Sequence, residues 1–168
     1  MTDSESLFLQ LVHEYDARLR RICRVYAADE DARGDLYQDI LVQLWRSLPS
    51  YAGAASAGTW LYRIALNTAI DGVRQRSVRR RGEPFVREAL HPQRVARPDE
   101  HVERAQATAR LYKAIERLDP IDRALVLLLL EERSYQEVSE ILGIGVSAVG
   151  VRLHRAKKKL GRWLEEAA

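Results

Sequence analysis

The chain has 168 residues, of which 46% are apolar and 30% are charged, and its formal net charge is +3. These values are typical of a folded soluble protein and exclude a disordered or low-complexity chain. A single cysteine excludes an internal disulfide, and the four histidines are scattered, so no structural zinc site is expected. The acidic N-terminus is unlike a signal peptide and no apolar run could span a bilayer, which together predict a cytoplasmic protein without membrane insertion.

The positive charge is concentrated in two blocks. Residues 59–82 hold six Lys or Arg and one acid, and residues 142–168 hold six Lys or Arg and two acids. The segments before and between these blocks are net acidic. Two separated basic blocks favour two contacts with polyanions over a uniformly basic coat, although solvated Arg-rich helix ends would give the same pattern.

Apolar residues at spacings of three and four predict three helices in the first half of the chain. The first covers about residues 5–27 and places Cys23 in the core, and the second covers residues 36–48 and ends at Pro49. Residues 50–58 form a loop of small residues. Thr59 is the predicted N-cap of the third helix, which runs into the arginines of residues 74–81.

Residues 82–99 contain three prolines and no apolar period, which predicts a flexible linker. Helical periodicity returns at about Glu100, and Asp119 followed by Pro120 is typical of a helix start. The apolar segment 124–130 predicts a buried helix. The expected fold is therefore all-α: a helical domain over residues 1–81, the linker over 82–99, and a second helical domain over 100–168.

The last third of the chain has the pattern of a helix-turn-helix. Ser134 and Glu137 predict a capping box at the start of a short helix that turns Tyr135 inward, and Gly143 allows the turn. The next helix, about residues 146–164, carries six basic side chains that are expected to face no acid. In such motifs this helix meets base edges and phosphates. The candidate contacts are Ser147, Arg152, His154, Arg155, Lys157 and Lys158.

Two surfaces of the first domain are further candidates for contacts. Trp60 stands among arginines, and rings interleaved with Arg suit single-stranded nucleic acid because unstacked bases stack on rings; a core position for Trp60 is the alternative. The polar side of the second helix is either solvated or a protein contact. No catalytic triad, metal-ligand cluster or Gly-rich phosphate loop occurs, so we expect no catalytic, metal or cofactor site.

Several segments of the chain match a known family. Residues 35–45 and 59–69 resemble conserved region 2 of extracytoplasmic-function sigma factors, a subfamily of the sigma-70 family of bacterial RNA polymerase sigma factors. Residues 118–120, 134–144 and 151–160 resemble region 4 of the same factors. The resemblance covers nearly the whole chain except the linker, and the presence of both regions in this order makes it highly specific.

The resemblance implies a transcription initiation factor that binds core RNA polymerase and promoter DNA, needs no cofactor and is not an enzyme. By this resemblance, the clamp of the largest polymerase subunits would bind Asp35, Gln38, Asp39, Gln43 and Trp45. The melted −10 promoter element would contact Tyr51, Trp60, Arg63, Asn67 and Arg74. The C-terminal domain would hold the −35 element as duplex. An anti-sigma factor would keep the protein inactive until a stress or envelope signal arrives.

The chain departs from the family pattern in two places. Gly145 stands where the family commonly has Ser or Thr, and Gly150 stands where it commonly has Lys. The loop over residues 50–58 is also rich in alanine. These departures keep two alternatives open: a degenerate sigma-like interaction protein that does not read promoters, and a stand-alone helix-turn-helix transcriptional regulator.

Overall fold

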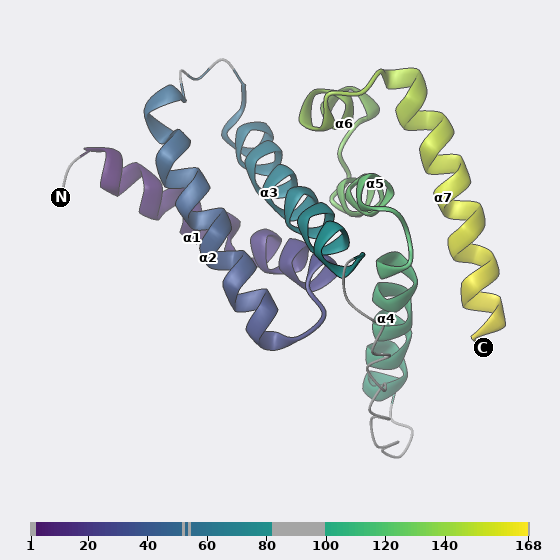
Figure 1. Cartoon of the computed structure of the whole chain (residues 1–168). Coiled ribbons are helices and arrows are strands. Elements are labelled where there is room, and N and C mark those ends of the chain that lie inside the picture. Colours follow the sequence, from purple (N-terminus) through teal and green to yellow (C-terminus); the bar gives the residue numbers. More distant parts are fainter. Residues whose placement is uncertain (1–2, 52, 54, 82–99, 168) are drawn as a thin grey trace.

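A computed structural model describes residues 3–51, 53, 55–81 and 100–167, which form seven α-helices and one short 3₁₀ helix (Figure 1). The elements are α1 (Asp3–Tyr26), α2 (Glu30–Ser47), η1 (Leu48–Ser50), α3 (Ala57–Arg80), α4 (Glu100–Glu116), α5 (Pro120–Leu130), α6 (Tyr135–Leu142) and α7 (Val146–Glu166). No strand occurs among the described residues, and the predicted all-α fold is confirmed. The predicted linker, residues 82–99, lies outside the described residues.

Helices α1, α2 and α3 pack into a three-helix unit. Leu19, Ile40 and Leu61, one from each helix, are fully buried at its centre. The Asp29 carboxylate caps α2 by accepting a hydrogen bond from the backbone N–H of Ala32 at 2.8 Å. Cys23 is buried as predicted, and burial raises the pKa of its thiol to about 11.

The start of α3 differs from the prediction. Its N-cap is Ser56, whose hydroxyl accepts a hydrogen bond from the backbone N–H of Thr59 at 3.2 Å. Thr59 is instead a buried residue of the first turn, and its hydroxyl accepts a hydrogen bond from Ser56 Oγ at 3.0 Å. Both residues satisfy the local preference for a cap, so the prediction chose wrongly between two hydroxyls three positions apart.

Helices α4 to α7 form a second unit around α5. Residues 124–128 of α5 are buried, as the apolar run predicted, whereas Leu130 at the end of that run is 50% exposed. The predicted capping box of α6 is present: Ser134 N donates to Glu137 Oε2 at 2.8 Å, and Glu137 N donates to Ser134 Oγ at 3.2 Å. Gly143 ends α6 with a φ of 67°, a conformation that favours glycine. The helix-turn-helix of α6 and α7 is thereby confirmed.

The two units pack against each other along α1 and α3 (Figure 1). Helix α1 contacts α4 and α5, while α3 contacts α5 and α6, and the buried side chains of both units form one continuous cluster. Arg18 and Arg21 of α1 both pair with Glu131, which follows α5. The Tyr26 hydroxyl donates a hydrogen bond to Pro120 O at 2.6 Å. The junction between the units thus combines apolar burial with hydrogen bonds and ion pairs.

Candidate nucleic-acid and protein interfaces

The exposed side of α2 carries the residues that the sequence predicted to bind polymerase. Leu36, Ile40 and Leu44 recur every four residues and turn inward, which leaves the opposite side of the helix to solvent. The exposed residues on the outer sides of α2 include Asp35, Gln38, Asp39, Gln43 and Trp45. Trp45 is 44% exposed, and its ring packs edge-on against that of Phe8 with 5.2 Å between ring centroids. The exposure of all five side chains is confirmed, and their binding role stays a prediction.

A groove of about 530 Å³ runs between α2 and α3. Asp39 and Gln43 line the groove from α2, and Asn67 lines it from α3. By the family resemblance, Asp39 and Gln43 were predicted to bind polymerase and Asn67 to bind the −10 element. The fold therefore places the two predicted surfaces side by side rather than on separate faces.

The predicted single-strand surface begins with an aromatic pair. The rings of Tyr51 and Trp60 lie 4.9 Å apart with an interplanar angle of 38°, and both residues are half-buried. Trp60 is thus neither a free stacking platform nor a fully buried core residue. Arg63, Asn67 and Arg74 are exposed on α3, and their spacings of four and seven residues put them on one side of the helix.

Part of this surface is covered by the second unit. Arg63 Nη2 donates a hydrogen bond to Glu140 O, near the C-terminal end of α6, at 2.9 Å. The Arg133 guanidinium lies over the Tyr62 ring, 5.2 Å from its centroid, which is a cation–π contact. These contacts join residues far apart in sequence, so the local patterns used for prediction carried no signal for them.

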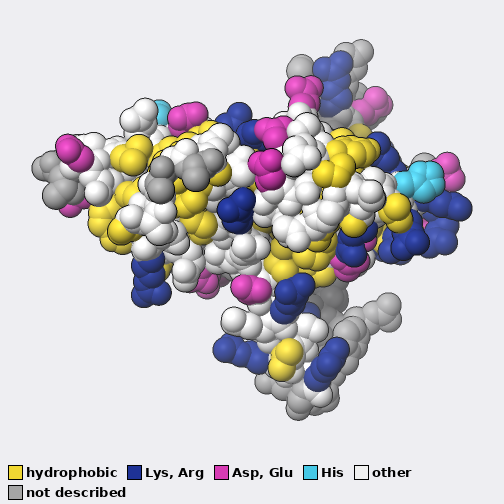
Figure 2. Space-filling view, turned by 90° about the horizontal axis from the view of Figure 1, so that it is seen from above, with side chains coloured by type: hydrophobic (Ala, Val, Ile, Leu, Met, Phe, Trp, Pro, Cys, Tyr) yellow, Lys and Arg dark blue, Asp and Glu magenta, His cyan; other side chains and the backbone are white. Residues whose placement is uncertain are grey.

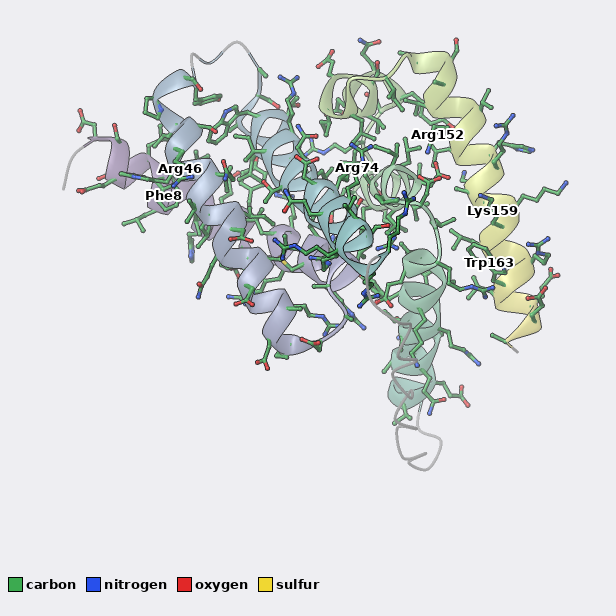
Figure 3. The ribbon with its side chains drawn as sticks, in the orientation of Figure 1. Phe8, Arg46, Arg74, Arg152, Lys159 and Trp163 are labelled. Atoms are coloured by element: carbon green, nitrogen blue, oxygen red, sulfur yellow. The ribbon has the colours of Figure 1, made fainter. Side chains whose placement is uncertain are left out.

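Helix α7 presents the predicted duplex-binding residues on its outer side. Val149, Leu153, Ala156 and Leu160 are its buried stripe. The exposed candidates are Ser147, His154, Arg155, Lys157 and Lys158, whereas Arg152 is only half-exposed. Lys and Arg side chains gather at the α7 end of the molecule in Figure 2, and Figure 3 shows Lys159 pointing away from the body. The exposure of the basic face is confirmed, and its contacts with DNA stay a prediction.

Arg152 corrects the expectation that the cations of this helix face no acid. Its Nη2 lies 3.0 Å from Asp119 Oδ1 and 2.8 Å from Asp122 Oδ1, the second contact lacking the alignment of a hydrogen bond. The Asp122 side chain is only 7% exposed, and burial, together with the adjacent Asp119, raises its pKa. Arg162 also has an acidic neighbour, Glu166, at 3.9 Å. Arg152 therefore offsets a buried negative charge inside the second unit.

The two glycines that depart from the family pattern do not interrupt α7. Gly145 is its N-cap and offers no side-chain cap. At Gly150 a Cβ would lie 3.6 Å from Tyr135 Cε2, an ordinary van der Waals contact. Tyr135 itself was predicted to face inward, but it is 44% exposed because it occupies the first position of α6, at the edge of the unit.

Within residues 3–51, 53, 55–81 and 100–167, no group of three or more His, Cys, Asp or Glu side chains could hold a metal ion. Over the same ranges, no helix is long and apolar enough to cross a membrane.

Comparison with known proteins gives consistent matches over both units. Residues 11–79 match the family model of sigma-70 region 2, and residues 108–160 match that of sigma-70 region 4. The chain is 34% identical over 127 residues to RNA polymerase sigma factor YlaC of Bacillus subtilis, covering 75% of this chain and 73% of the relative. It is 27% identical over 161 residues to the ECF RNA polymerase sigma-E factor of Haemophilus influenzae, covering 91% and 85%.

Two solved structures are similar over nearly the whole chain. CnrH in complex with the cytosolic domain of CnrY has a TM-score of 0.70 at 25% identity, covering 98% of this chain and 91% of that one. The sigma factor RpoE of Bartonella quintana, in complex with the anti-sigma factor NepR, has a TM-score of 0.72 at 23% identity, covering 94% and 96%. The arrangement of both helical units is thus shared with these proteins.

Proposed function

The chain belongs to the extracytoplasmic-function subfamily of the sigma-70 family of RNA polymerase sigma factors, and we propose how its surfaces divide the work of promoter-specific transcription initiation. Helix α2 binds core polymerase, the Tyr51–Trp60 pair and α3 bind the melted −10 element, and α7 binds the −35 duplex. The protein acts by binding alone, in the cytoplasm, without catalysis. One observation carries this proposal: each family region coincides with a helical unit that exposes a surface of the required chemistry.

The polymerase contact is supported by the mixed character of the exposed side of α2. Trp45 offers an aromatic side chain that is 44% exposed, and aromatic residues of this kind often dominate the binding energy of protein interfaces. The carboxylates of Asp35 and Asp39 lie on the exposed side of the same helix and supply charge complementarity to a basic partner surface.

The single-strand contact is supported by rings and cations along one side of α3. Bases stack on aromatic rings, and stacking is tolerant of sequence, while Arg63 and Arg74 are placed to contact phosphates. Extrusion of a base costs on the order of a few kcal/mol, which capture by this surface must offset. The Tyr51–Trp60 pair is the element best placed to provide that capture.

The duplex contact is supported by the exposed basic face of α7. Ser147 and His154 lie toward the end that reaches base edges in helix-turn-helix proteins, and Arg155, Lys157 and Lys158 are free to contact phosphates. Arg152 shares its guanidinium between two carboxylates. We therefore assign Arg152 a positioning role that holds α5 against α7, and the remaining candidates carry the DNA contacts.

Regulation by an anti-sigma factor fits the junction between the units. The similar RpoE structure contains the anti-sigma factor NepR. In this chain Arg63 is engaged by Glu140 O when the units are packed together. A partner that stabilises this packing keeps part of the −10 surface covered until a stress or envelope signal removes it.

Run-off transcription with purified core polymerase tests the proposal. Asp39→Ala is expected to weaken core binding and lower the transcript, whereas Asp31→Ala, an exposed acid near the start of α2, serves as the matched control. Arg155→Ala is expected to weaken duplex binding about tenfold and leave core binding unchanged, with Arg162→Ala as its control on the same helix.

Two results would contradict the proposal. Tight core binding without any promoter-specific transcript would instead indicate a degenerate sigma-like interaction protein. Sequence-specific duplex binding by a dimer of the free protein would indicate a stand-alone helix-turn-helix regulator.

A further inference from the structure

A pocket lies where the two helical units meet, away from the surfaces assigned to polymerase and the −35 duplex. It has a volume of about 730 Å³ and is lined from α1 to α5, by residues of both units. Its floor includes apolar side chains such as Val25 and Val73. Its charged lining residues are Arg76, Arg80, Arg81, Arg123, Asp29 and Glu116.

Two of these arginines, one from each unit, are fixed at the C-terminal end of α1. Arg76 Nη2 donates a hydrogen bond to Tyr26 O at 3.0 Å. Arg123 Nε donates to Leu118 O at 2.9 Å, and its Nη1 donates to Val25 O at 3.5 Å. These bonds to neutral carbonyls hold both guanidinium groups at the pocket without neutralising them. Neither arginine has a salt bridge within the described ranges.

The pocket therefore holds an excess of positive charge: Arg76, Arg80 and Arg81 are exposed, and Arg123 is half-buried. Arg80 and Arg81 also lack an ion pair with any described residue. Of the two acids, Asp29 already caps α2, and burial raises the pKa of Glu116. Burial also lowers the pKa of Arg123, because desolvation disfavours the charged guanidinium. A bound anion would offset that cost.

We propose that this junction pocket binds a nucleotide, with its phosphates on Arg76, Arg80 and Arg123 and its base on the apolar floor. Guanidinium groups match phosphate oxygens in bidentate geometry, and the pocket volume lies in the range of small-molecule sites. Because the lining comes from both units, the nucleotide binds their packed arrangement and stabilises it. A partner that separates the units therefore weakens nucleotide binding. By linkage, the nucleotide weakens binding of that partner by the same factor.

Isothermal titration of the full chain with ATP and with inorganic tripolyphosphate tests the site. We expect saturable binding of one ATP per chain and weaker binding of tripolyphosphate, which lacks the base. Absence of saturable ATP binding at millimolar concentration would overturn the proposal. Equal affinity for the two compounds would overturn the assignment of a nucleotide.

Two variants separate a defined pocket from diffuse attraction. Arg80→Gln is expected to raise the Kd for ATP about tenfold. Arg79→Gln removes the neighbouring exposed charge, which does not line the pocket, and is expected to leave the Kd nearly unchanged. Both positions are exposed, so folding should be preserved, and urea unfolding checks this. Equal weakening by the two variants would contradict a built site.

A third variant tests the requirement for both units. Glu131→Gln removes the acid that pairs with Arg18 and Arg21 across the junction, outside the pocket itself. Looser packing of the units should raise the Kd for ATP. Hydrogen exchange measures whether the junction of this variant is looser. A looser junction with an unchanged Kd for ATP would refute a site shared between the units.

Discussion

Replacement of Arg152 by Ala tests whether the cations of α7 serve stability or DNA binding. Arg152 contacts the buried Asp122 carboxylate at 2.8 Å and the more exposed Asp119 carboxylate at 3.0 Å. Arg155 lies on the same helix, is exposed and has no ion pair with any described residue. The substitutions Arg152→Ala and Arg155→Ala remove the same charge, yet we expect opposite consequences.

The size of the effect follows from the burial of the partners. Loss of one partner costs about 1–3 kcal/mol for a buried hydrogen-bonding group and about 3–5 kcal/mol for a fully buried ion pair. The Arg152 side chain is 36% exposed and that of Asp119 is 52% exposed, so water screens part of the interaction. Asp122 also limits the cost by taking up a proton, since its pKa is already raised by burial. We therefore expect Arg152→Ala to lower the free energy of unfolding by about 1–2 kcal/mol.

Urea unfolding and duplex binding by fluorescence anisotropy measure the two properties separately. Arg155→Ala should leave the free energy of unfolding within about 0.5 kcal/mol of the unsubstituted protein and weaken duplex binding about tenfold. Asp122→Asn introduced into Arg152→Ala should restore part of the lost stability, because the buried charge is then removed. If Arg152→Ala unfolds like the unsubstituted protein, or if Asp122→Asn restores nothing, the assigned role of this ion pair is wrong.

Four further substitutions yield predictions of their own. Gly150→Ala should stabilise the protein by about 0.5–1 kcal/mol in urea unfolding, because the added Cβ fits at 3.6 Å from its nearest neighbour. Gly58→Ala should destabilise it, because the Cβ would lie 3.0 Å from a tyrosine hydroxyl. Glu131→Gln should speed hydrogen exchange in α5 by weakening the junction, and unchanged exchange would contradict this. Hydrogen bonds from Ser134 lower the pKa of the Glu137 carboxyl. Its contribution to stability is therefore present above its ordinary pKa and is lost as the pH falls through the lowered pKa. In thermal melts, Glu137→Gln should lose less stability on acidification than the unsubstituted protein.

Features decided by neighbouring residues could be predicted from the sequence. The capping box of Ser134 and Glu137 and the left-handed Gly143 depend on residues a few positions apart, and both are present. The buried stripes of α2 and α7 followed from apolar periodicity. Even locally the prediction failed at Ser56 and Thr59, because both residues have the local preference of an N-cap and the sequence pattern does not distinguish them.

Pairings between distant residues could not be predicted. Periodicity shows which side of a helix faces outward, but it does not show which residue of another helix lies opposite. Arg152 and Asp119 are separated by 33 positions, and Arg63 and Glu140 by 77. The same arginine can therefore be interpreted as a phosphate contact or as an ion-pair partner until the tertiary structure is known.

Under the proposed function, the contact between Arg63 and Glu140 couples binding of the −10 strand to the packing of the units. The Glu140 carbonyl, near the end of α6, carries partial negative charge and accepts a hydrogen bond from Arg63 Nη2. A DNA phosphate would need the same N–H group as its donor. One N–H cannot serve both acceptors fully, so a bound strand competes with the packed arrangement at this position. An exposed hydrogen bond of this kind is worth only about 0.5–1.5 kcal/mol, which a phosphate contact can replace. A strand that binds through Arg63 would therefore shift the equilibrium from packed to separated units. The size of the shift equals the difference between the strand's affinities for these two arrangements.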